Sequence, residues 1–293
     1  DRHDGLGKIG PFHSATVPTL EAAVNISYDL RYMEDSRRST VLNAPGARST
    51  LRVLDVLEAV ARTPGLRLTD IAAQTEYAPA TLHRALSVLL DRNYLVRDGD
   101  SGRYQLGSAA VQLSQIAVGG NGFAHIARQA GAALADETGE TVHVAIWRKP
   151  ELSYLLKWES NKALRVAMAS NIGSLIPLHA TALGKAVLAA VPVSQREAIL
   201  TGEGLERFTE NTIVTDSTLQ AELSRTQELG YAVDNEEHEP GVRCVGAAIR
   251  DARDRIIGAV SVSAPASRLR EADIARTGSE VMRAARAIGE SLV

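Results

Sequence analysis

The stretch TDIAAQTEYAPATLHRALSVLLDRNYLVRDGDSGRYQLG, residues 69–107, decides the fold of the first half of this chain. Its opening residues have helical spacing, Thr69 is placed to cap them, and a turn at residues 77–79 follows. Pro79 suits the first turn of a longer helix that runs to about residue 93. Two short β-prone runs then flank the turn DGDSG, which predicts a hairpin.

A helix with an apolar stripe precedes this stretch. Leucine and valine recur at helical spacing from Ser49 until Pro64 and Gly65 end the pattern. The order of helix, helix, turn, helix and two-stranded hairpin, within about 60 residues, is typical of a winged helix-turn-helix. We therefore expect such a domain at residues 46–107, with its third helix in the major groove of DNA.

The third helix is amphipathic, and its polar side chains are the candidates for DNA contact. The residues expected to meet base edges or phosphates are Thr81, His83, Arg84 and Ser87. Arg97 and Arg103 flank the hairpin tip, where they would meet the DNA backbone or the minor groove. A plain packing module remains the alternative. Charge does not decide between the two, because residues 46–107 hold 8 Arg and 7 Asp or Glu.

Length and composition limit the classes of protein that fit. A chain of 293 residues predicts about two domains. The 32 Lys and Arg against 35 Asp and Glu give no global reason to expect a polyanion partner. A single cysteine, Cys244, excludes a disulfide framework and a multi-cysteine zinc site, and it fits a reducing cytosol. No run approaches the ~20 apolar residues of a membrane helix, so we expect no membrane partner.

The remaining segments divide at glycines. Residues 1–45 lack a sustained period and predict a flexible N-terminal arm, without the pattern of a signal peptide. After the hairpin, SAAVQLSQIAV predicts an apolar helix that ends at the cluster Gly119–Gly122. We expect residues 108–122 to form a linker helix and glycine hinge, with the helix packed against a second copy. Residues 123–293 then form a second domain.

The second domain mixes strands and helices, which predicts an α+β fold with a mostly antiparallel sheet and helices packed on one face. The expected strands cover residues 140–148, 152–160, 163–168, 231–237, 242–251 and 256–265. Helices are expected at residues 123–139, within 177–191, at 194–200, from 216 to a terminating Gly230, and at 270–292.

One group of polar residues in this domain indicates a lined pocket. Strand alternation places Val242, Cys244 and Gly246 on one face, and Ser261 and Ser263 on one face of the following strand. Asp234 ends the strand YAVD. The segment HATALGKA adds the first amides of a helix, at residues 181–183, which suit an anion such as a carboxylate.

An enzyme is the alternative interpretation of this group. Cys244 with His179 or His238 could form a nucleophilic pair, with the N-terminal unit acting only in dimerisation. A mid-strand cysteine is more often an inert small hydrophobe, and the spacing does not resemble a metal site. No phosphate loop, dinucleotide fingerprint or G-x-S-x-G motif is present, so no cofactor is expected. The run at residues 236–239 reads as a solvated loop, and a pure interaction scaffold remains a third possibility.

From about Ser49 to the C-terminus the chain resembles the IclR family of bacterial transcriptional regulators. The N-terminal match is TDIAAQTEYAPATLHRALSVLLDRNYLV with GRYQLG, and the C-terminal match is PLHATALGKAVLA, GYAVDNEEHEPGVRCVGAAIRD and SVSAP. The family signature is met by Gly230, Asp234, Glu237 and Cys244. Arg250 stands before Asp251 where the family usually has an aromatic residue or histidine.

The resemblance implies a winged-helix regulator with a GAF-like, six-stranded effector domain that forms dimers or tetramers. In relatives that bind small organic acids, the matching polar pocket residues are Ala182, Leu183, Asp234, Cys244, Ser261 and Ser263. The matching apolar wall is Met168, Ile176 and Val242. We expect a cytoplasmic repressor that binds operator DNA, responds to a small organic or aromatic acid, and controls a catabolic operon. Asp234 beside a carboxylate ligand must be protonated or meet a ligand hydroxyl.

Overall fold

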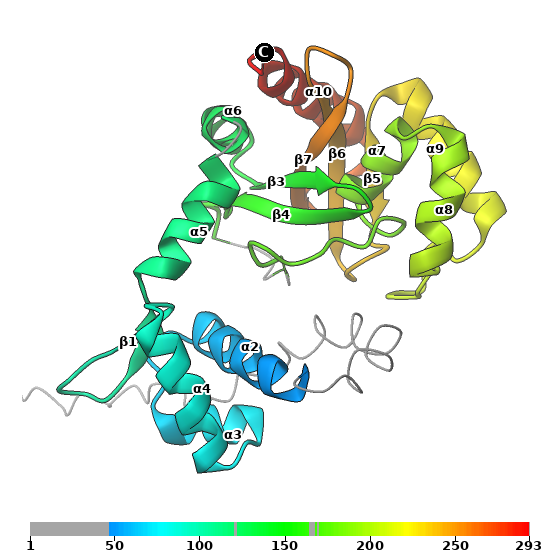
Figure 1. The fold of residues 1–293 in the computed structure, drawn as a ribbon. Helices are drawn as coiled ribbons and strands as arrows, with labels where there is room; N and C mark the ends of the chain where they lie inside the picture. Colours follow the sequence, from blue (N-terminus) through cyan, green and yellow to red (C-terminus); the bar gives the residue numbers. More distant parts are fainter. Residues whose placement is uncertain (1–46, 120–121, 164–167, 169, 293) are drawn as a thin grey trace, which may run out of the picture.

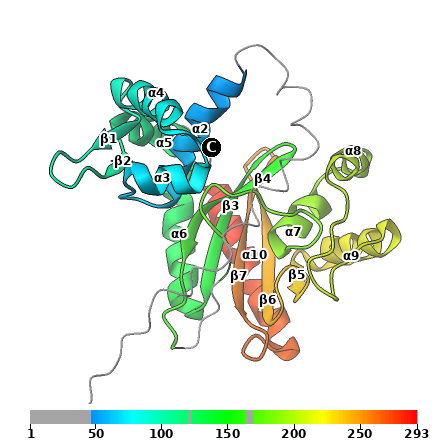
Figure 2. The same cartoon turned by 90° about the horizontal axis from the view of Figure 1, so that it is seen from below.

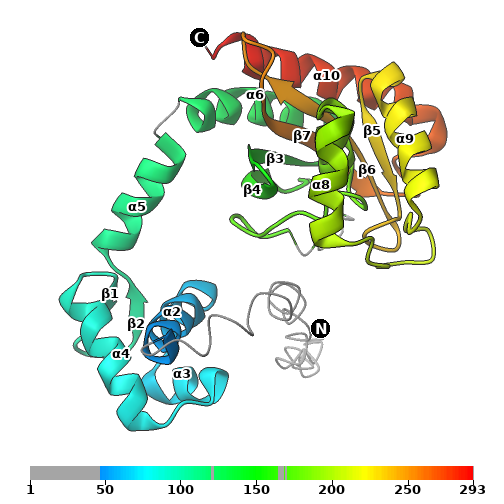
Figure 3. The same ribbon diagram turned by 45° about the vertical axis from the view of Figure 1, so that its right-hand side comes forward.

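The computed structural model describes residues 47–119, 122–163, 168 and 170–292 (Figure 1). The arm expected at residues 1–45 lies outside these residues. A small helical body with a hairpin and a larger body with a sheet are joined by α5 (Ser108–Gly119), as Figure 3 shows. A helix is thus present where the linker helix was expected, and residues 120–121 of the expected glycine hinge lie outside the described residues.

The small body has the predicted winged helix-turn-helix order. It consists of α2 (Ala47–Arg62), α3 (Leu68–Thr75), α4 (Pro79–Asp91), β1 (Leu95–Arg97) and β2 (Tyr104–Leu106). Its own core buries side chains from every helix and from both strands, among them Val56, Ile71, Leu86, Leu95 and Tyr104.

The predicted cap of α3 is wrong. The helix starts after Arg67, whose backbone N–H donates to Asp70 (2.8 Å), so that Thr69 lies within the first turn. Asp70 therefore binds the amide of the residue that precedes the helix, and its negative charge suits the positive end of the helix dipole.

The larger body is built on an antiparallel sheet, which confirms the predicted α+β class. In the described part of the chain its strand order is β4-β3-β7-β6-β5. The strands are β3 (Thr141–Arg148), β4 (Glu151–Trp158), β5 (Ala232–Asn235), β6 (Val242–Arg250) and β7 (Ile256–Pro265). The sixth strand expected at residues 163–168 falls mainly on 164–167, which lie outside the described residues.

Helices cover both faces of this sheet (Figure 2). One face packs on α6 (Phe123–Thr138) and α10 (Ile274–Glu290), which follows a 3₁₀ turn at Glu271–Asp273. The other face meets α7 (Ala182–Ala190), with α8 (Val193–Glu203) and α9 (Asp216–Leu229) outside it. The expectation of helices on one face is wrong, because the strands are apolar or small on both sides. Val260 faces the first layer, and Ala259 faces the second.

Helix α7 is fixed to the sheet and to its neighbours at both ends. A Cβ atom at Gly246 of β6 would lie 3.1 Å from the carbonyl carbon of Ala182, so a side chain there would push α7 away by a few tenths of an ångström. Side chains from three elements donate to carbonyl oxygens at the C-terminal end of α7. These are Arg196 to Ala189 (2.9 Å), Gln227 to Ala189 (2.7 Å) and Arg250 to Ala190 (3.0 Å).

Among the helices of the described residues, none combines the length and the apolar character that a membrane span requires.

Replacing Gly184 by alanine should destabilise the larger body. A Cβ atom at Gly184 would lie 2.4 Å from Cα of Leu178, and that backbone cannot move aside cheaply. Overpacking of this kind costs about 1–3 kcal/mol, more than the ~1 kcal/mol that alanine gains over glycine in a helix. Thermal unfolding should show a lower Tm for Gly184→Ala. The control Gly99→Ala, where nothing lies within 4 Å, should leave the Tm unchanged. An equal Tm for both variants would contradict this account of α7.

Candidate functional site

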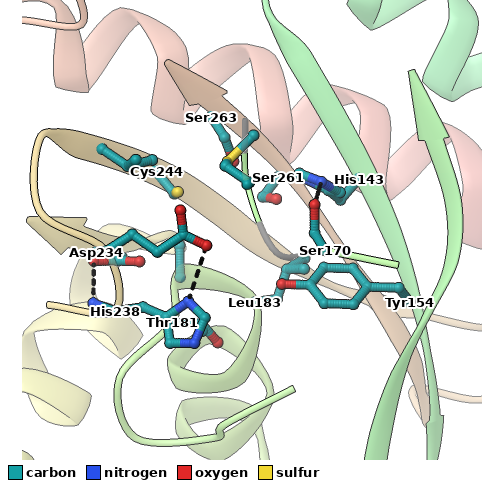
Figure 4. A pocket seen from close by; sticks show the side chains of 14 residues that line it. His143, Tyr154, Ser170, Thr181, Leu183, Asp234, His238, Cys244, Ser261 and Ser263 are labelled. Atoms are coloured by element: carbon teal, nitrogen blue, oxygen red, sulfur yellow. Dashed lines mark hydrogen bonds and ion pairs between the residues drawn. The ribbon is translucent and has the colours of Figure 1, made fainter. Parts of the chain in front are cut away.

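A small cavity lies between the sheet and the N-terminal end of α7 (Figure 4). Its free space is about 30 Å³. It is lined by His143, Tyr154, Met168, Ser170, Thr181, Ala182, Leu183, Asp234, His238, Glu239, Val242, Cys244, Ser261 and Ser263. A single water needs roughly 10–15 Å³ on this measure, so the cavity has room for only a few non-hydrogen atoms.

The structure brings together eight of the nine residues predicted for an effector site. Those eight are Met168, Ala182, Leu183, Asp234, Val242, Cys244, Ser261 and Ser263. Ile176 is not among the lining residues. Its backbone N–H donates to the carbonyl of Leu152 (2.9 Å), and its side chain is buried in the core between the sheet and α7–α9. This placement corrects the expectation that Ile176 forms part of the pocket wall.

Strand register explains why the polar side chains meet. Cys244 of β6 lies opposite Asp234 of β5 on one side and opposite Ser263 of β7 on the other. Ser261 lies opposite His143 of β3. Side chains directly across an antiparallel pair are about 4.5–5.5 Å apart, so these two rows form a continuous polar floor.

The N-terminal end of α7 forms the facing wall. Thr181 caps the helix, because its Oγ1 accepts from the amide of Gly184 (3.0 Å) while donating to the carbonyl of Pro177 (2.8 Å). Ala182 and Leu183 line the cavity, and their amides, in the first turn of the helix, have no acceptor within it. Together with the helix dipole, they offer a site for an anion.

Asp234 is the acidic group of this cavity, and it is only 3% exposed. Burial raises the pKa of Asp234 to about 7, the nearby Glu237 carboxylate adds to the rise, and Lys185 opposes it. Its Oδ1 accepts from the backbone N–H of Glu237 (2.8 Å). A carboxyl group of this kind is partly protonated at neutral pH, so it can donate a hydrogen bond to an anionic ligand or accept one from a hydroxyl.

His143, Tyr154 and Ser170 line the cavity but were missed by sequence reasoning. Burial lowers the pKa of His143 to about 3, so its imidazole is neutral at physiological pH. Nε2 of His143 lies 2.8 Å from Oγ of Ser170, and its ring centroid lies 5.2 Å from that of Tyr154. The usable signal was a lone polar residue in the apolar strand TVHVAIW.

The geometry gives no support to a nucleophilic Cys244. Burial raises the pKa of the Cys244 thiol well above its ordinary value, and the charge of Asp234 adds to that rise. Nε2 of His179 is hydrogen-bonded to the carbonyl of Glu206 (2.8 Å), and His238 packs edge-on against Phe208. Within the described residues, no group of three or more His, Cys, Asp or Glu side chains could hold a metal ion.

The charge run at residues 236–239 is not wholly solvated, as had been expected. Glu237 is only 5% exposed and pairs with the buried Lys185 of α7. The solvated-loop interpretation is therefore wrong for Glu237.

The residues predicted to contact DNA lie on the outer side of the small body. His83, Arg84 and Ser87 are exposed on α4, and Thr81 is half-buried at its start. The guanidinium of Arg97 lies 5.9 Å from the ring centroid of Tyr104, and Nη1 of Arg103 donates to the carbonyl of Gly65 (2.5 Å). The four α4 residues therefore form one presented surface, whereas the two hairpin arginines make contacts within the domain.

A winged helix-turn-helix joined by a linker helix to a domain with a small internal cavity defines a ligand-responsive DNA-binding regulator. Two family models match this chain: the IclR helix-turn-helix domain over residues 49–99, and the bacterial transcriptional regulator IclR C-terminal domain over residues 115–290. The chain belongs to the IclR family of bacterial transcriptional regulators. The predicted family and regulatory class are confirmed.

Curated relatives of similar length are transcriptional regulators. The HTH-type transcriptional regulator BhcR of Paracoccus denitrificans is 32% identical over 241 residues, covering 82% of this chain and 86% of BhcR. XynR of Escherichia coli is 32% identical over 242 residues, covering 83% of this chain and 94% of XynR. The transcriptional repressor IclR of Escherichia coli is 29% identical over 256 residues, covering 86% and 93% of the two chains.

Solved structures share the fold. The IclR structure from Thermotoga maritima matches with a TM-score of 0.73 at 28% identity, covering 84% of this chain and 98% of that one. An IclR homologue from Microbacterium hydrocarbonoxydans, complexed with 4-hydroxybenzoate, matches with a TM-score of 0.68. Its identity is 23%, and it covers 83% of this chain and 98% of that chain, so this likeness establishes the fold alone.

Cys244 should react slowly with alkylating agents in the native protein. The thiolate is the reactive species, and the cavity keeps the thiol protonated. Cys244 is the only cysteine in the chain, so iodoacetamide labelling followed by mass spectrometry reports on it alone. At pH 7.5 the native protein should react at least tenfold more slowly than the urea-unfolded protein. Labelling of the native protein at the unfolded rate would revive the nucleophile interpretation.

Proposed function

We propose that this regulator represses a catabolic operon by binding its operator through α4, and that a short organic acid in the cavity changes that binding. The observation that carries the proposal is the convergence of the α7 amides, Asp234 and the strand serines on one small cavity. The raised pKa of the Cys244 thiol favours a cavity that binds its ligand over one in which the thiol attacks it.

The chemistry of the cavity favours an acid with a second polar group. A ligand carboxylate suits the amides of Ala182 and Leu183, with Ser261 and Ser263 as further donors. A hydroxyl or keto oxygen on the neighbouring carbon would then meet Asp234, which can accept or donate at neutral pH. Short 2-hydroxy and 2-keto acids have both groups in this arrangement.

The size of the cavity separates short acids from aromatic ones. With free space of about 30 Å³, it holds only two or three water-sized groups, so an acid of two to four carbons needs a small outward movement of the walls. A hydroxylated aromatic acid, the other class expected from the sequence, would need a larger movement. We therefore propose short acids as the effector class.

The quaternary arrangement is part of the proposal. Helix α5 exposes the apolar side chains of Val111, Leu113 and Ile116, of which Ile116 is 71% exposed. Covering these side chains with a second copy would make a dimer that reads a pseudo-palindromic operator, and two dimers could form a tetramer. Residues 46–107 would bind DNA, and residues 108–122 would couple them to the effector domain at 123–293. Since the bacterial chromosome lies in the cytoplasm, we place the protein there.

Arg84→Ala should weaken operator binding selectively. If Arg84 reads a base edge, the variant should lose about 1–3 kcal/mol, which is roughly 5- to 150-fold in Kd. Fluorescence anisotropy at physiological salt should compare DNA upstream of the protein's own gene with a random duplex. The matched control is Arg62→Ala, since Arg62 is exposed at the end of α2 and pairs with Glu58. Wild-type binding that does not distinguish the two DNAs would refute the proposed repressor function.

Effector binding should weaken as the pH rises from 6 to 8. With its pKa raised to about 7, Asp234 is mostly protonated at pH 6 and mostly ionised at pH 8, where it repels a ligand carboxylate. Isothermal titration calorimetry with lactate or pyruvate should show a Kd that increases up to about tenfold per pH unit above 7.

Asp234→Asn supplies the control for this prediction. Its amide oxygen can still accept from the Glu237 N–H but cannot ionise, so its Kd should be nearly independent of pH. This variant also separates Asp234 from His238 and Glu239, which are further titratable residues of the cavity lining. A wild-type Kd that does not change, or that tightens with pH, would show that Asp234 binds a hydroxyl in its ionised form.

A further inference from the structure

A buried ion pair lies directly behind the cavity and is not part of its lining. Lys185, in the first turns of α7, is 0% exposed, and its ammonium donates to Oε1 of Glu237. Glu222 of α9 lies 3.6 Å from the same ammonium. Burying a charged pair has a large desolvation cost, and apolar residues of similar volume are often at least as stable. The pair is therefore a candidate for a role beyond stability.

Glu237 links this ion pair to the acidic wall of the cavity. Its side-chain Oε1 accepts from Lys185 and from the backbone N–H of Asn235 (3.3 Å). Its own backbone N–H donates to Oδ1 of Asp234 (2.8 Å). A movement of the backbone at Glu237 therefore moves the hydrogen-bond donor that orients the Asp234 carboxyl group.

The turn that carries these residues has a demanding conformation. Glu236 has a φ of 61°, which is in the left-handed region that residues other than glycine seldom adopt. The outer side of the turn is held by Thr209, which donates to the carbonyl of Glu236 (2.7 Å), and by Thr212, which donates to that of Glu237 (2.6 Å). Lys185 provides the tie from the side of α7.

We propose that Lys185 is a positioning residue for the effector, because its bond to Glu237 fixes Asp234 at a set distance from the amides of α7. The Lys185 ammonium lies on α7, whose first turn forms the proposed anion site. The Glu237 carboxylate lies on the turn that follows Asp234. The ion pair thus joins the two walls that a 2-hydroxy acid must span. This inference rests on the proposed effector function and gives a role to the lysine of ALGKA and to the glutamate of the family signature.

The test compares Lys185→Met with a matched control, Glu222→Gln. Both variants remove a charge from the same cluster, but Glu222 lies on α9 rather than on the turn that orients Asp234. The probes are lactate and propionate, which have the same number of carbons and differ in the 2-hydroxyl that would meet Asp234. Calorimetry at a temperature where each variant is folded gives the ratio of the two Kd values.

In the wild-type protein and in Glu222→Gln, lactate should bind about tenfold or more tightly than propionate. In Lys185→Met this preference should fall to within about twofold, since Asp234 is no longer aimed while the α7 amides still hold the carboxylate. A variant that is only less stable would keep the ratio. An unchanged ratio in folded Lys185→Met overturns the proposal.

Two further measurements keep the result decisive. If Lys185→Met does not fold, the double variant Lys185→Met with Glu237→Met removes both buried charges and should show the same loss of preference. A folded double variant with the wild-type ratio overturns the proposal. The titration of the wild-type protein separates the two claims. If it binds neither acid, the proposed effector class fails and the role of Lys185 fails with it, whereas a wild-type preference that persists in Lys185→Met overturns the role of Lys185 alone.

Discussion

The approach of α7 to the sheet at Gly246 is the constraint on which the cavity depends. A side chain at this position would crowd the backbone of Ala182 at 3.1 Å, and the helix would have to give way at the end where Ala182 and Leu183 line the cavity. The strands supply acceptors and hydroxyls in a fixed register, but they become a site only when the helix lies within reach. The missing Cβ atom at Gly246 therefore lets the two polar surfaces approach as closely as they do.

The electrostatics around the cavity depend on two buried carboxyl groups that lie near one buried ammonium. Asp234 is buried beside Glu237, and both carboxyl groups are held near a single buried ammonium. His143 on the opposite side is neutral. Burial and Glu237 raise the pKa of Asp234, while Lys185 opposes the rise, so the protonated and ionised forms of Asp234 are close in free energy. A proton or a ligand can therefore change the charge of the cavity.

Sequence patterns predicted the helices, the strands and the side chains that share a strand face well. They predicted contacts between residues that are distant in the sequence poorly. Alternation in AVSVSA and VRCVG placed the serines and Cys244 correctly, because a strand has a strict period of two. The same period does not say which strands are neighbours, so His143, more than 100 residues from its partner Ser261, was missed. Glu237 was read as solvated, because its partner Lys185 lies 52 residues earlier and only the fold brings them together. Ile176 was assigned by family resemblance, and local backbone pairing with Leu152 takes its side chain elsewhere.

The two ends of α7 differ in how their free backbone groups are hydrogen-bonded. Arg196, Gln227 and Arg250 complete the carbonyl end from three separate elements, so that end is satisfied from within the chain. At the other end Thr181 accepts from one amide, and Ala182 and Leu183, whose amides have no acceptor within the helix, line the cavity. An anionic effector of the proposed kind would act there as an external cap and finish a helix that the polypeptide leaves incomplete. Its binding would then stiffen the start of α7, so that the ligand changes the order of one helix end more than the overall shape.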